Sequence, residues 1–225
     1  MQDYIPIFMF GGFALFIVAL IAYSHYAAKK RAEAMCAVAG RMGFKYQQKA
    51  ERAQDNYAHL NLFSRGHSRR AINFLYGEKN EVEVSIVDYH YTVGSGKSSH
   101  HYAQTICIIK DPTLDLPNFF VRRENKFSDF LGKVFGGQDI NFTEDEKFSS
   151  AFVLQGKSES ETRHLFNQRV RDAFGKLAGS SAQIEGQGDS VVVHKGTIIK
   201  PEDLTMLLKD TFDVYNALKA RDADY

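Results

Sequence analysis

The chain has 225 residues, of which 44% are hydrophobic and 24% charged, with 28 Lys and Arg against 27 Asp and Glu. This near-average composition excludes a fully disordered chain and a collagen-like fibre. Two cysteines, Cys36 and Cys107, are too few for a disulfide framework, and the length suits one domain with at most a small appendage.

The first feature along the chain is an apolar segment, residues 5–28, that contains no Asp, Glu, Lys or Arg. A helix of this length crosses a hydrocarbon core of roughly 30 Å. A cleaved signal peptide is the competing interpretation, but it needs positive charge before its apolar region, and only Asp3 precedes this one. We therefore predict an uncleaved transmembrane anchor over residues 1–28.

Positive charge follows the anchor directly, as Lys29, Lys30 and Arg31. The positive-inside rule then predicts a single-pass protein with its N-terminus outside and its C-terminal domain in the cytoplasm. Residues 29–43 are rich in alanine and end at Gly43, so we expect the helix to continue through them as a juxtamembrane segment. The remaining residues, 44–225, form the predicted cytoplasmic domain.

The membrane-proximal part of the chain is basic, because residues 29–70 hold ten Lys and Arg but only three acids. Such a segment is attracted to an anionic leaflet. For the residues beyond Arg31, an ordinary solvated helix followed by basic strands explains the charges equally well. The candidate contacts to anionic lipid or to a protein partner are Lys29, Lys30, Arg31, Arg65, Arg69 and Arg70.

Strands dominate the middle of the chain, and helices come late. Alternating and β-branched patterns predict strands at 43–48, 59–65, 70–77, 81–93, 101–110, 119–123 and 150–156. A helix over 158–178 begins with a capping box at Ser158, a hairpin turns at 187–189, and Pro201 opens the last helix. The pattern predicts an α+β fold: an N-terminal transmembrane helix, then a mostly antiparallel, β-rich domain with two late amphipathic helices.

The segment Gly94-Ser95-Gly96-Lys97-Ser98 resembles the end of a phosphate-binding P-loop. The motif requires a glycine where Tyr91 stands, and a helix should follow where the sequence reads as another strand. Turn glycines in a β-hairpin explain the segment better, so we do not expect a nucleotide ligand. We expect no nucleic acid either, since no basic stripe interleaves with the aromatic residues.

The same hairpin suggests a metal site. If its turn centres on residues 95 and 96, Ile86 faces Thr105, Asp88 faces Ala103, and His90 faces His101. Asp88, His90 and His101 then form a three-ligand site for zinc or a similar divalent metal. The two histidines also suit a phosphate headgroup or a pH-sensing role, but the plain surface of an exposed hairpin tip explains them better.

Several stretches resemble a family of bacterial membrane-anchored proteins of uncharacterised function. They are residues 73–77, 88–91, 94–98, 104–105, 136–142, 148–149 and 152–154. The resemblance implies a bacterial protein with a short N-terminal anchor and a cytoplasmic domain, and hence the inner membrane. It implies no catalytic residues.

The leading interpretation is therefore a membrane-anchored cytoplasmic interaction domain without a cofactor. It binds a membrane-protein partner or an anionic lipid surface. No HExxH, CxxC, GxSxG or GxGxxG motif favours an enzyme, and Cys107 reads as an inert buried thiol within a strand. The alternative is a metal-dependent enzyme or ligand-binding domain that uses Asp88, His90 and His101.

Overall fold

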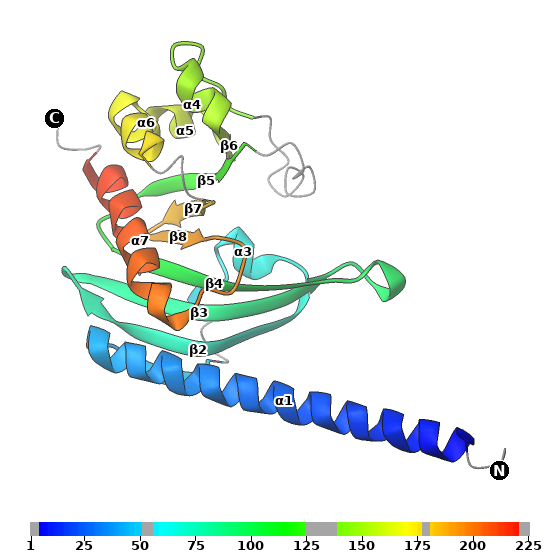
Figure 1. Cartoon of the computed structure of the whole chain (residues 1–225). Helices are drawn as coiled ribbons and strands as arrows, with labels where there is room; N and C mark the ends of the chain where they lie inside the picture. Colours follow the sequence, from blue (N-terminus) through cyan, green and yellow to red (C-terminus); the bar gives the residue numbers. More distant parts are fainter. Residues whose placement is uncertain (1–4, 51–55, 125–138, 177–180, 221–225) are drawn as a thin grey trace.

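The computed structural model describes residues 5–50, 56–124, 139–176 and 181–220; residues 1–4 of the predicted anchor lie outside this part. Its eight strands form one antiparallel sheet in the order β1-β2-β3-β4-β8-β7-β5-β6 (Figure 1). The strands are β1 (Lys45–Lys49), β2 (His67–Lys79), β3 (Val82–Val93), β4 (His100–Lys110), β5 (Leu116–Arg123), β6 (Phe152–Gly156), β7 (Gln183–Gly188) and β8 (Ser190–His194).

Helices lie on both faces of this sheet. They are α1 (Ile5–Met42), α3 (Asn61–Ser64), α4 (Glu146–Ala151), α5 (Glu159–Leu165), α6 (Gln168–Gly175) and α7 (Leu204–Lys219), with short 3₁₀ turns η2 (Gly96–Ser98) and η3 (Pro201–Asp203). The α+β class, the antiparallel pairing and the N-terminal apolar helix agree with the prediction.

Alternation along the strands gives the sheet two separate apolar cores. On β3, Val84 and Ile86 join the larger core, which helices α1 and α7 cover. Val87 and Tyr89 point the other way, into a smaller core closed by α3 and the residues before it. Both faces of the central strands are therefore buried.

Helix α1 has two halves with opposite surroundings, and it runs unbroken between them. Its apolar residues from Phe13 to Tyr26 are exposed, whereas Ala32, Met35 and Val38 are buried against the sheet at helical spacing. In the described part of the chain, one helix is long and apolar enough to cross a membrane, over residues 12–42. The segment predicted as juxtamembrane thus forms part of the domain's core.

Two predicted elements were wrong. Residues 59–65 form no strand: α3 and its flanks pack as a short helix, with Leu62 and Phe63 buried under the sheet. The helix predicted over 158–178 is divided into α5 and α6, because the side chain of Asn167 accepts a hydrogen bond from the backbone N–H of Val170 and starts a new helix. The cap predicted at Ser158 is confirmed by its bond from Glu161 N–H.

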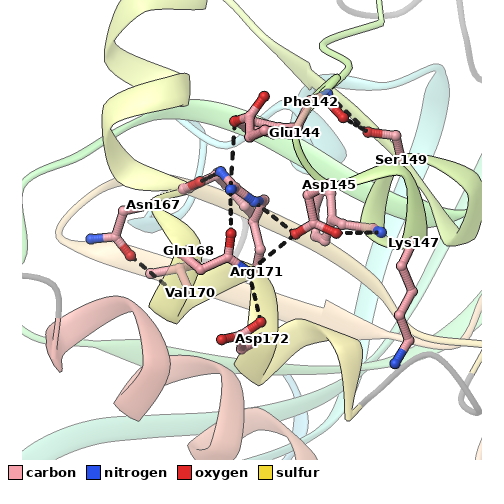
Figure 2. Close-up of polar contacts among 12 residues, drawn as sticks. Phe142, Glu144, Asp145, Lys147, Ser149, Asn167, Gln168, Val170, Arg171 and Asp172 are labelled. Atoms are coloured by element: carbon pink, nitrogen blue, oxygen red, sulfur yellow. Dashed lines mark hydrogen bonds and ion pairs between the residues drawn. The ribbon is translucent and has the colours of Figure 1, made fainter.

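A buried arginine holds α6 against the start of α4 (Figure 2). Arg171 donates from Nε to the Asp145 carboxylate at 2.9 Å and from Nη1 to the Phe166 carbonyl, and its guanidinium lies 4.2 Å from the centre of the Phe142 ring. Asp145 in turn caps α4 by accepting from Phe148 N–H, and these bonds hold the pKa of Asp145 below its usual value. We interpret this cluster as structural, since its hydrogen bonds cap α4 and join α6 to the start of α4.

Gly156 and Gly175 offer a matched pair of substitutions. A Cβ at Gly156 would lie 2.1 Å from Thr162 Oγ1, so Gly156→Ala is expected to destabilise the domain by roughly 1–3 kcal/mol through overpacking. At Gly175 a Cβ meets nothing within 4 Å, so Gly175→Ala is expected to be neutral or stabilising by up to about 1 kcal/mol. Urea unfolding of both full-length variants in detergent checks this, and equal effects would contradict it.

Candidate functional site

The centre of this region is a buried carboxylate paired with an arginine of α1. Arg31 donates from Nε and Nη2 to the two oxygens of Asp88, each at 2.7 Å. Asp88 is 1% exposed and also accepts from Asn73 Nδ2 and Thr105 Oγ1, both at 2.8 Å. A bidentate, fully hydrogen-bonded pair of this kind joins α1 to the sheet at one defined point.

A bulge in β2 places Asn73 in this arrangement. The pairing of β2 with β3 shifts between Ile72 and Leu75, and Asn73 within the bulge has a φ of 53°. Asparagine tolerates this left-handed conformation better than most residues do. The bulge turns the Asn73 amide toward α1, where its Oδ1 accepts from Tyr46 Oη at 2.9 Å while Nδ2 donates to Asp88.

The loop that leads to α7 is tied to the same point. Thr105 Oγ1 accepts from the backbone N–H of Ile199 at 2.9 Å, and the Thr105 N–H donates to the carbonyl of Thr197 at 3.0 Å. Helix α1, strands β2, β3 and β4, and this loop therefore meet around one ion pair.

A pocket of about 280 Å³ lies beside the pair. It is open to solvent, and its apolar lining comes from α1, β2 and the loop before α7. The Nδ1 atom of His90 is buried there without a hydrogen-bond partner, and burial, followed by the nearby Arg70, lowers the pKa of His90. The lining residues are Ala28, Arg31, Gln48, Lys49, Ile72, Asn73, Asp88, His90 and Ile198.

The predicted register of the β3–β4 hairpin was wrong by two residues. Asp88 faces Thr105, His90 faces Ala103, and His101 faces Thr92, because residues 94–99 make a longer turn that includes η2. The rings of His90 and His101 still lie diagonally 5.7 Å apart, but both Asp88 oxygens are taken by Arg31, Asn73 and Thr105. Within the described residues, no group of three or more His, Cys, Asp or Glu side chains is placed to hold a metal ion.

The six basic candidates differ in their surroundings. Lys29, Lys30 and Arg70 are exposed, and Lys29 lies 4.0 Å from Glu33. The guanidinium of Arg31 is paired with the Asp88 carboxylate. Arg69 is exposed but donates to the Phe63 carbonyl. Arg65 is buried on the opposite face of the sheet, with Nε and Nη2 unpartnered and its guanidinium 5.6 Å from the Phe120 ring centre.

The predicted turn at 94–98 is present. Gly94 and Gly96 have φ values of 86° and 55°, and strand β4 follows. Residues 96–98 form one short 3₁₀ turn instead of a phosphate-binding helix start. Cys107 is fully buried, and burial raises its pKa to about 12, as expected of an inert thiol.

A buried polar cluster under α3 was not predicted from the sequence. The Glu185 carboxylate accepts from the backbone N–H groups of Asn61 and Leu62, and burial, opposed by these bonds and by Arg65, raises its pKa. His194, on the neighbouring strand, is buried, and burial lowers its pKa to about 3. Alternation marks both positions as sheet positions, but it does not show which face α3 covers.

These observations define an antiparallel α+β domain carried on an N-terminal apolar helix. No protein-family model matches the sequence, and no curated protein sequence matches it. The fold is similar to the crystal structure of the mycobacterial trehalose monomycolate transport factor A, TtfA, with a TM-score of 0.61 and 10% identity, over 84% of this chain and 94% of that chain. At this identity the likeness shows the fold alone.

Proposed function

We propose that the chain is a single-pass bacterial inner-membrane protein whose cytoplasmic domain acts as an accessory factor by binding an integral-membrane partner. The observation that carries the proposal is the unbroken helix α1, exposed and apolar at one end and part of the domain's core at the other. Since the same helix supplies anchor and core, the domain is held at one height and orientation over the bilayer. A domain held in this way recognises a partner in the same membrane more readily, because the anchor raises the effective concentration of the domain near that partner.

The proposed orientation rests on charge. Lys29 and Lys30 follow the apolar segment and are exposed, and Arg31 is the last residue of this basic group. Cytoplasmic flanks of membrane spans are enriched in such residues, which supports a cytoplasmic domain and an outward N-terminus.

The similar fold of TtfA supports a role connected with membrane transport. That protein is described as a trehalose monomycolate transport factor, and the likeness covers nearly its whole length. We extend to this chain only the general idea of an accessory factor, so the partner we propose is a membrane protein engaged in transport.

The experiment is a crosslinked pull-down of the full chain from gently solubilised membranes. We expect one integral-membrane protein in near-stoichiometric amount. A chain whose residues 5–27 are replaced by an unrelated span is the matched control, because it keeps the domain in the membrane. We expect the partner to be retained there, whereas its loss would assign recognition to the span and contradict recognition by the domain.

Two charge variants locate the contact. Lys29 and Lys30 lie on the exposed face of α1 near the domain, so Lys29→Glu with Lys30→Glu is expected to reduce recovery of the partner. Lys79→Glu, at the far end of β2, is the control and should leave recovery unchanged. The absence of any stoichiometric membrane protein with the inserted full chain would contradict the proposed function.

A further inference from the structure

The β3–β4 hairpin extends beyond the body of the sheet, on the side where α1 leaves the domain (Figure 1). We infer that the tip of this hairpin, residues 92–101, lies among the lipid headgroups of the membrane that holds α1 and makes a second membrane contact. This inference rests on the membrane insertion of α1 that the proposed function assumes.

Three pairs of neighbouring residues show that α1 runs alongside the strands. Phe44, which follows the helix, packs against Gly77 of β2, and Arg31 pairs with Asp88 of β3. Further along α1 toward its N-terminus, Ala28 lines the same pocket as His90 of β3. From Met42 to Arg31 the helix rises about 17 Å, and from Val84, the partner of Gly77, to Asp88 the strand β3 covers about 13 Å. Helix and strands thus advance together toward the membrane side.

The hairpin continues well past the pair of Arg31 and Asp88. From Asp88 to Val93 the strand advances about 17 Å, and the turn of residues 94–99 lies beyond it. The same distance along α1 corresponds to about eleven residues, which reaches the level of residue 20. That level lies deep within the apolar segment, whose side chains are exposed.

If α1 stood upright in the bilayer, a hairpin tip at the level of residue 20 could not stay in the cytoplasm. With Lys29 at the interface, residue 20 lies about 14 Å further along the helix, whereas the headgroup layer is only about 5–7 Å deep. The tip cannot enter the hydrocarbon either, because its turn exposes polar side chains and backbone groups outside regular structure. A tilted α1, common among membrane helices, brings the tip to headgroup depth.

The charges of the hairpin suit anionic headgroups. Residues 67–77 and 89–104 contain no Asp or Glu, whereas the other end of the same strands carries Glu78, Glu81 and Glu83. Lys97, His100 and His101 are exposed at the tip, and Arg70 is exposed behind it. The hairpin end of the sheet therefore carries basic side chains without acidic ones, whereas the other end mixes these three acids with Lys79 and Lys110.

The test measures depth in the full chain, reconstituted in vesicles of equal parts phosphatidylcholine and phosphatidylglycerol. Cys36, which is exposed, is replaced by serine, and the buried Cys107 stays. A fluorophore is placed in turn at Ser98→Cys in the tip, Val18→Cys in the span and Glu83→Cys, an exposed position at the far end of β3. Nitroxide-labelled lipids quench it from the headgroup or from the middle of the acyl chain.

We expect the Ser98 probe to lose fluorescence mainly to the headgroup nitroxide, the Val18 probe mainly to the acyl-chain nitroxide, and the Glu83 probe to neither. Lys97→Glu should reduce quenching of the Ser98 probe, and Lys79→Glu should not. An unquenched Ser98 probe beside a quenched Val18 probe would overturn the inference and leave the anchor intact, as would a Ser98 probe quenched mainly from the acyl chains. An unquenched Val18 probe would remove the membrane anchor and the proposed function with it.

Discussion

Replacing Arg31 with alanine is expected to destabilise the domain by about 3–5 kcal/mol, because it leaves the buried Asp88 carboxylate without its cation. Asp88 is 1% exposed and would keep only the bonds from Asn73 and Thr105. The loss should be greatest where α1 packs on the sheet. Urea unfolding of the full chain in detergent measures the stability, and amide exchange over residues 32–42 measures the loosening of the helix.

The matched control is Lys30→Ala, since Lys30 is the exposed neighbour of Arg31 on the same helix. Its effect should stay within about 0.5 kcal/mol, as for other surface positions. A double variant, Arg31→Ala with Asp88→Asn, removes the uncompensated charge and should recover part of the loss. Equal effects of Arg31→Ala and Lys30→Ala would show that the pair adds no stability.

The second large effect expected is a dependence of stability on pH that comes from His194. Burial lowers the pKa of His194 to about 3 in the folded domain, against 6.5 for an ordinary histidine. Between these values the unfolded chain binds a proton that the folded chain does not, so stability from this group is complete above pH 6.5 and falls as the pH is lowered. The slope is about 1.4 kcal/mol per pH unit, which amounts to about 5 kcal/mol at pH 3.

Glu185 has the opposite sign, since its pKa is raised in the folded state and its contribution is lost as the pH rises. The His194 effect is therefore best measured as a difference between wild type and His194→Asn, in urea unfolding at several pH values between 4 and 7. We expect wild type to lose its advantage over the variant as the pH falls. The control is His164→Asn, at an exposed position of α5, and a pH-independent difference for His194→Asn would refute the prediction.

The sequence by itself determined the features that depend on local pattern. The uncharged segment of residues 5–28 identified the apolar helix, because length and lack of charge need no tertiary partner. Alternating residues identified most strands and the two hairpins, and Pro201 and Ser158 marked helix starts. The α+β class followed from their order.

Only the tertiary structure decided how these elements meet. A shift of two residues leaves every side chain of a strand on the same face, so alternation could not distinguish the predicted register from the observed one; the six-residue turn at 94–99 decided it. Arg31 and Asp88 are separated by 57 positions, and Asn73, which also bonds to Asp88, lies in a bulge of another strand. The ion pair thus depends on packing between distant segments, which local periodicity does not encode.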